Sequence, residues 1–242
     1  MRYFTKEWYN DTVIAEMCFA FRKTQKADVY SDKFFEKLYV IEKKAYLKHS
    51  KRAAKFEKRK FDPIVSSKEF DRNYEENLAF VKANLPEEIL CDIKDLRVLA
   101  LGSVTYEMAA RITRFCGQIN NRCEALKRKY DEANDEVVDR MGGCIPHLFS
   151  ELCGAPIAEV VCEGNDAVVT TSHEYTGMAV RIILSGAELV ERDEDIEGAM
   201  IYKYELLPYG ESKIEFSVLA IEEDSTLVTF TFTADSLKID EI

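Results

Sequence analysis

The side chains that could carry chemistry are few, and the densest group is His173, Glu174 and Tyr175. A histidine, an acid and a tyrosine in sequence could bind a ligand, and the turn formers around them predict the loop of a β-hairpin, where binding residues are often found. A polar turn with an incidental histidine explains the same residues, so we treat all three as binding candidates. No catalytic residue is predicted, because nucleotide-binding loops, His-Glu-x-x-His and Gly-x-Ser-x-Gly are all missing from the sequence.

Metal ligands are equally scarce. One grouping of Cys and His has spacings that fit no standard zinc site: Cys144, His147, Cys153 and Cys162. The acidic stretch 193–198 begins like a calcium loop, but the twelfth position of that loop would be Tyr204 rather than Glu. We therefore expect no metal and no cofactor. The seven cysteines contain no Cys-x-x-Cys pair, which favours reduced thiols.

Basic residues concentrate in one predicted helix. Between Lys43 and Lys60 the chain has nine Lys or Arg and a single acid, Glu57. On a helical wheel Lys48, Lys51 and Lys55 lie along one flank, which could contact nucleic-acid phosphates. The stretch lacks the interleaved aromatic residues of a stacking surface, and basic helix faces are usually solvated or paired within the protein. Binding of nucleic acid through 43–60 is therefore an alternative that we do not favour.

The acidic residues concentrate at the other end of the chain. The net charge of −11 divides into +3 for residues 1–154 and −14 for residues 155–242. An acidic surface repels phosphate and attracts cationic groups, so the acidic region predicts a basic protein as partner.

Helical periodicity dominates the first half of the chain. Thr5 is a good N-cap for a first helix, and a second helix from about Ser31 to residue 60 carries an apolar stripe that includes Ile41, His49 and Phe56. Ser66 with Glu69 resembles a capping box that would begin a third helix. Two further helices bring the expected number to about five.

Strict alternation replaces this spacing after residue 157. Val228, Phe230 and Phe232 alternate with threonines, and Met200, Tyr202, Tyr204 and Leu206 form a similar series. Short turns between the runs predict hairpins. The sequence therefore predicts an α+β fold: helices in a first domain, 1–153, and an antiparallel sheet of seven or eight strands in a second, 154–242. One face of that sheet is expected to be polar, and the helices are expected to cover the other.

The first residues carry a resemblance. After Met and a basic residue, residues 3–9 read Tyr-Phe-Thr-Lys-Glu-Trp-Tyr, which resembles the opening of a bacterial domain family of unknown function. Similar phrases follow in the β half, at 187–190, 197–199, 202–205 and Tyr209. The chain departs from the family at 152–154, which read Leu-Cys-Gly where members have a His-Asp pair. The resemblance implies an architecture and no mechanism.

No apolar run is long enough to span a membrane, and the first residues lack the apolar core of a signal peptide. We therefore expect a cytoplasmic protein without a membrane partner. The missing catalytic patterns favour a non-catalytic intracellular binding or interaction protein whose acidic β region receives its partner. An enzyme with dispersed carboxylates is an alternative, because sites assembled from distant residues leave no local motif. The oligomeric state cannot be predicted from these patterns.

Overall fold

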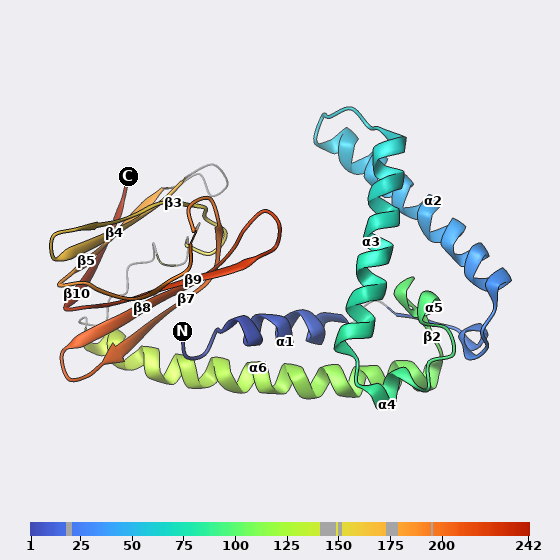
Figure 1. Cartoon of the computed structure of the whole chain (residues 1–242), viewed down its shortest axis with the longest axis horizontal. Helices are drawn as coiled ribbons and strands as arrows, with labels where there is room; N and C mark the ends of the chain where they lie inside the picture. The colour runs from blue at the N-terminus through green and yellow to red at the C-terminus, as the bar shows by residue number, and fades with distance from the viewer. Residues whose placement is uncertain (18–20, 141–148, 150–151, 173–178, 195) are drawn as a thin grey trace. The chain divides into compact units, whose positions relative to one another are not determined.

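The computed structural model describes residues 1–17, 21–140, 149, 152–172, 179–194 and 196–242 (Figure 1). The chain divides into two compact units, which we call the β unit (Met1–Thr12 with Asn121–Ile242) and the helical unit (Val13–Asn120). This division differs from the predicted boundary at 153/154, because residues 1–12 and the second half of the longest helix pack with the strands. Helices precede antiparallel strands along the chain, which confirms the α+β class.

The eight described strands that follow residue 156 form two sheets rather than the single sheet predicted. One has the order β10-β5-β4-β3 and the other β6-β9-β8-β7, with all neighbours antiparallel. The strands are β3 (Ile157–Glu163), β4 (Asp166–Thr171), β5 (Val180–Ser185), β6 (Glu188–Arg192), β7 (Met200–Tyr209), β8 (Lys213–Ile221), β9 (Leu227–Ala234) and β10 (Ser236–Glu241). The single-sheet prediction was wrong because short links can also carry the chain from one sheet to the other.

The apolar faces of the two sheets form one core. Phe216, Phe230 and Phe232 from one sheet and Ile182 and Leu184 from the other are all 1% exposed or less and belong to the same cluster. The predicted alternation in β9 is therefore confirmed. Helices were predicted to cover the apolar face of the sheet. This prediction is corrected, because the apolar face of each sheet is buried in part by the other sheet.

The two sheets exchange strands in a repeated pattern. In each half, β3–β6 and β7–β10, three consecutive strands pair as a meander and the fourth crosses to the other sheet. Thus β6 pairs with β9, and β10 pairs with β5. The sequence shows no internal repeat, so this duplication is visible only in the topology.

The polar face of the β6-β9-β8-β7 sheet is also buried. The side chains of Glu205, Ser217, Thr231 and Thr233 are at most 3% exposed. Residues 2–6 bind to this face: the backbone of Phe4 bonds Glu205, the side chain of Arg2 pairs with Glu215, and Lys6 pairs with Asp193. A sheet face that the sequence predicts to be merely polar is therefore an internal surface.

Within its described residues, the helical unit contains four whole α-helices, α2 (Asp32–Phe56), α3 (Pro63–Asn84), α4 (Glu87–Leu90) and α5 (Leu96–Ala100), and a 3-10 helix at Gln25–Asp28. It also contains a short parallel pair of strands, β1 (Arg22–Lys23) and β2 (Ser103–Val104). Two further helices, α1 (Lys6–Glu16) and α6 (Tyr106–Arg140), belong to it in part. Asp62 caps α3 and Pro63 occupies its first turn, so the predicted start at Ser66 is wrong by one turn. Proline fits there because the first turn has no intrahelical partner for its missing N–H. The core of this unit includes Val81, Leu99 and Ile112.

Candidate functional site

The predicted binding candidates His173, Glu174 and Tyr175 lie outside the described residues. The strands on either side of them, β4 and β5, pair antiparallel, so the segment connects two neighbouring strands. Its role as a binding loop stays a prediction.

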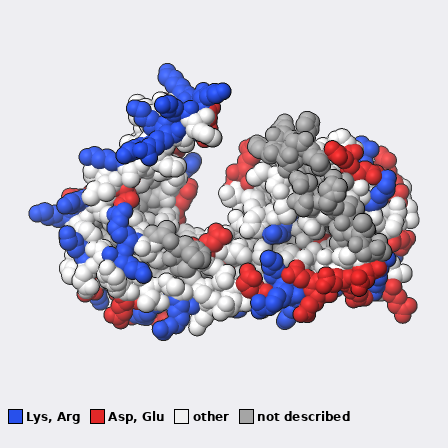
Figure 2. All heavy atoms as spheres, turned by 180° about the vertical axis from the view of Figure 1, so that it is seen from behind, with Lys and Arg blue, Asp and Glu red and all other residues white. Residues whose placement is uncertain are grey.

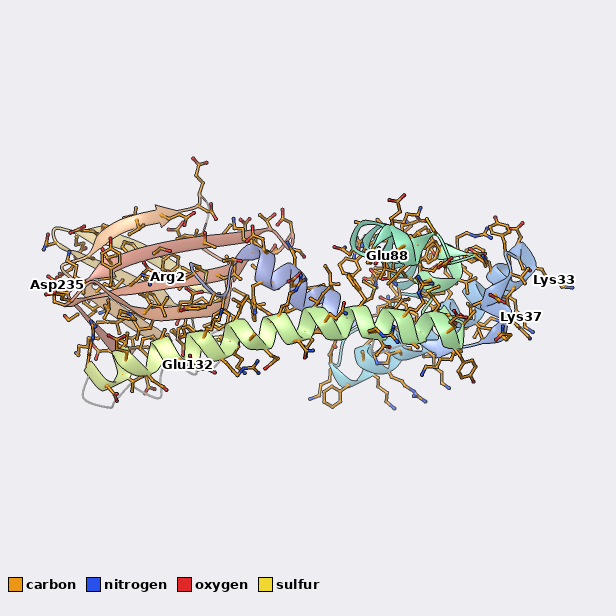
Figure 3. All side chains as sticks on the ribbon, turned by 90° about the horizontal axis from the view of Figure 1, so that it is seen from below. Arg2, Lys33, Lys37, Glu88, Glu132 and Asp235 are labelled. Carbon is orange, nitrogen blue, oxygen red and sulfur yellow. The ribbon has the colours of Figure 1, made fainter. Side chains whose placement is uncertain are left out.

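The other predicted candidates, Lys48, Lys51 and Lys55, lie in the second half of α2 and are all exposed. Residues three or four apart share one face of a helix. The same spacing extends this face toward the start of α2, so we define the lysine face by its six exposed members: Lys33, Lys37, Lys44, Lys48, Lys51 and Lys55. From first to last they cover about 33 Å, at 1.5 Å per residue. Lys33 and Lys37, labelled in Figure 3, project outward from α2.

The opposite side of α2 packs on α3 and fixes the orientation of the helix. Ser31 caps α2 through a hydrogen bond from the N–H of Phe34. Tyr39 packs edge-on against Phe70, with ring centroids 5.2 Å apart, and donates its hydroxyl to Asp71 at 2.5 Å. These contacts leave the lysine face directed away from α3.

Lys43 shows how a basic residue on this packed side behaves. Its ammonium donates to Asp71 at 2.5 Å, which together with the Tyr39 hydroxyl lowers the pKa of that carboxyl. Burial and the bond to Asp71 raise the pKa of Tyr39. Lys43 is therefore neutralised within the unit.

The lysine face is not neutralised in this way. The ion pairs of α2 use Asp32, Glu42 and Lys43. Within the described ranges, none of the six lysines of the lysine face forms an ion pair. The face is therefore a row of positive charges whose counter-charge must come from solvent ions or from a partner.

Large apolar side chains are exposed where α2 ends and α3 begins. We call residues 55–65 the tip. Phe56 is 90% exposed, Ile64 68% and Val65 51%. The chain here is held by the N–H of Arg59, which bonds the carbonyl of Ala54, and by Asp62, which accepts from the N–H groups of Ile64 and Val65. The tip is thus an ordered turn that displays apolar groups.

The exposure of Phe56 corrects the sequence analysis. The apolar stripe of an amphipathic helix normally faces protein, yet Ile41 is 46% exposed and His49 is also exposed. Periodicity identifies the stripe, but α3 covers a different side of α2. Figure 2 shows Lys and Arg gathered at the end of the helical unit where α2 meets α3. Phe56, a residue of the basic stretch 43–60, therefore presents an exposed aromatic ring, and the prediction that this stretch has no aromatic group for stacking is corrected.

The β unit carries the opposite charge. It has 12 Lys or Arg against 28 Asp or Glu, a net charge of −16. Part of this charge forms an acidic face on the second half of α6, defined by Glu124, Asp131, Glu132, Asp135 and Asp139. All five are exposed, and among the residues that the structure describes none of them forms an ion pair. Glu132 is labelled in Figure 3.

The described residues hold no group of three or more His, Cys, Asp or Glu side chains that could bind a metal. Asp193, the first residue of the stretch that resembles a calcium loop, instead accepts hydrogen bonds from Lys6 at 2.9 Å and from the N–H of Thr229 at 2.8 Å. Cys91, Cys123, Cys153 and Cys162 are free thiols, and burial raises the pKa of Cys153. No helix of the described ranges is long and apolar enough to cross a membrane.

Sequence reasoning missed two parts of this site. Lys33 and Lys37 could have been found by extending the helical wheel toward Ser31. Nothing in the local sequence predicts that Ile64 and Val65 are exposed, because the same residue types also form buried core contacts. No family model, no curated protein and no solved structure matches this chain.

Proposed function

We propose that this chain is a non-catalytic binding protein that binds a polyanionic partner through the lysine face of α2. The observation that carries the proposal is that six lysines share one side of a helix and that, in the described part of the chain, no carboxylate pairs with them. The sequence favours the acidic region as the partner surface instead, because lysines on a basic helix are usually solvated or paired internally.

The physical basis is counterion release. A row of unpaired lysines attracts a polyanion. When the lysines bind, they replace the cations that had been held along the polyanion, and the release of these cations to solution favours binding. Consecutive lysines at 44, 48, 51 and 55 are three or four residues apart, so their spacing along the axis is about 4.5–6 Å. Because the packing of α2 on α3 fixes the helix, its lysines are aligned before any partner arrives.

Heparin, a polyanion with no bases and no lipid, tests this proposal directly. The variant Lys48→Glu/Lys51→Glu/Lys55→Glu should elute from a heparin column at clearly lower salt than the wild type. The logarithm of its affinity should depend less steeply on the logarithm of salt concentration, by about one unit per lysine removed. Three exposed lysines elsewhere in the helical unit, Lys23, Lys82 and Lys94, supply a control with the same change of charge. Equal elution of the two triple variants would refute a specific role for the lysine face.

A second candidate function follows from the acidic face of α6. We propose that the β unit receives a basic protein partner there, supported by five exposed carboxylates without ion pairs in the described structure. A lysine-rich peptide should bind the wild type, and the charge reversal Asp131→Lys/Asp135→Lys should weaken that binding. The variant Lys48→Glu/Lys51→Glu/Lys55→Glu, which we call the lysine-face variant, should bind the same peptide as well as the wild type does. The two candidate functions are therefore tested separately.

A further inference from the structure

We propose that the polyanion is the surface of an anionic phospholipid bilayer, and that the tip enters its interface while neighbouring lysines contact the headgroups. This inference rests on the proposed function and names the partner of the same site. The sequence predicts no membrane partner, because no segment is long and apolar enough to span a bilayer. Contact with the interface requires only a projecting apolar group beside basic residues.

The apolar component is Phe56, Ile64 and Val65. Each is at least half exposed, and they occur within ten residues at the turn between two helices. Asp62 holds the first turn of α3 through the N–H groups of Ile64 and Val65, at 2.8 and 3.2 Å. The turn therefore presents these side chains without a folding step. Exposed apolar clusters rimmed by polar residues mark sites of protein or membrane contact.

The charged component lies beside the apolar one along the chain. Lys51, Lys55, Lys58 and Lys60 are exposed, and within the described structure none of them is ion-paired. Arg59 is paired with Glu57. Clusters of four to eight basic residues beside an interfacial segment are typical of proteins that bind anionic lipids, because each charge adds attraction near the surface. Lysine and a bulky apolar residue thus occur together at one end of the helical unit.

The aliphatic residues favour a bilayer over nucleic acid. A nucleic acid offers phosphates to lysines and base faces to an aromatic ring, so it could use the lysine face and Phe56. Ile64 and Val65 would gain nothing from phosphate. A lipid interface provides a partner for all three apolar side chains as well as for the lysines.

Vesicle flotation tests the inference. Wild-type protein should float with vesicles of phosphatidylglycerol and phosphatidylcholine and should stay unbound with phosphatidylcholine alone. The variant Phe56→Ser/Ile64→Ser/Val65→Ser should lose about tenfold or more of its affinity for the anionic vesicles. A control variant with three other exposed apolar residues changed, Val29→Ser/Leu189→Ser/Val190→Ser, should bind like the wild type.

A spectroscopic readout does not depend on a loss of function. Tryptophan emission of Phe56→Trp should shift to the blue on addition of anionic vesicles, whereas Val29→Trp should not shift. Undiminished flotation of the tip triple variant would overturn the inference. Binding of a labelled oligothymidylate, lost in the lysine-face variant, together with no flotation of the wild type, would identify nucleic acid instead. Loss of heparin binding by the lysine-face variant would then still support the proposed function, so the failures of the two proposals are distinguishable.

Discussion

The carboxylate of Glu205 accepts the backbone N–H of Phe4 at 2.5 Å, although the two residues are 201 positions apart. The same carboxylate accepts the N–H groups of Tyr3 at 2.7 Å and of Arg2 at 2.8 Å, and Glu205 is fully buried. Burial of a carboxylate is costly unless its charge is compensated, and three N–H donors provide that compensation. The start of the chain is thereby fixed to the polar face of a sheet near its other end.

We predict that Glu205→Gln destabilises the protein substantially. The glutamine amide retains one acceptor oxygen but places an NH2 group against the backbone N–H donors. Hydrogen bonds to a charged group contribute about 1.5–3 kcal/mol each, so we expect the free energy of unfolding to fall by about 2–4 kcal/mol. Urea denaturation measures it. Glu223→Gln, at an exposed turn, is the control and should change stability by less than about 0.5 kcal/mol. A loss no larger than that of the control would mean that the three bonds do not hold residues 2–4.

The two faces of β9 should respond unequally to truncation. Phe230 is 1% exposed in the core between the sheets, so Phe230→Ala should cost about 3–5 kcal/mol. Thr231 lies on the opposite face, where its hydroxyl donates to the hydroxyl of Ser217 at 2.9 Å. Thr231→Ala should cost about 1–3 kcal/mol, because the buried hydroxyl of Ser217 loses its hydrogen-bond donor. Thr226→Ala in the exposed turn before β9 should be nearly neutral. Chemical unfolding of the three variants checks this order, and a smaller loss at Phe230 than at Thr231 would contradict it.

Asp193 should contribute to acid sensitivity. Burial acts to raise the pKa of Asp193, but hydrogen bonds from Lys6 and Thr229 outweigh it, and the pKa lies below the ordinary value of 3.8. A carboxyl whose pKa is lower in the folded state stabilises that state above its unfolded pKa, and the contribution is lost as pH falls through the folded value. The stability difference between wild type and Asp193→Asn should therefore be present near neutral pH and shrink below 3.8. Urea titrations at several pH values measure it, and a difference independent of pH would exclude this role.

The outer edge of β7 should depend on α6. The side-chain amide of Asn134 donates to the carbonyl of Leu206 at 2.8 Å. Covering an edge strand satisfies its free backbone groups and prevents pairing with other chains. Asn134→Ala should lower the free energy of unfolding by about 1–2 kcal/mol and promote association at high concentration. Asp135→Ala, its exposed neighbour, is the control for thermal unfolding and light scattering.

The sequence by itself determined the class of the fold and the faces of its individual elements. Helical spacing located α2 and α3, and alternation placed Val228, Phe230 and Phe232 together on one side of β9. These features follow from local geometry, because the periods of a helix and a strand decide which neighbours share a face. The lysines at 48, 51 and 55 were assigned to one flank of α2 by the same reasoning.

Tertiary structure decided what covers each face. A bulge between Ile201 and Lys203 interrupts the alternation in β7, so Tyr202 contacts Tyr9 whereas Tyr204 joins the core. Phe56 is exposed because α3 packs on another side of α2, and Glu205 is buried because residues 2–4 return to it. Such contacts join residues far apart in the chain, and they depend on shape and hydrogen bonding between elements rather than on the spacing within one. Periodicity indicates which residues lie together, but only the packed structure shows which face meets protein and which remains free for a partner.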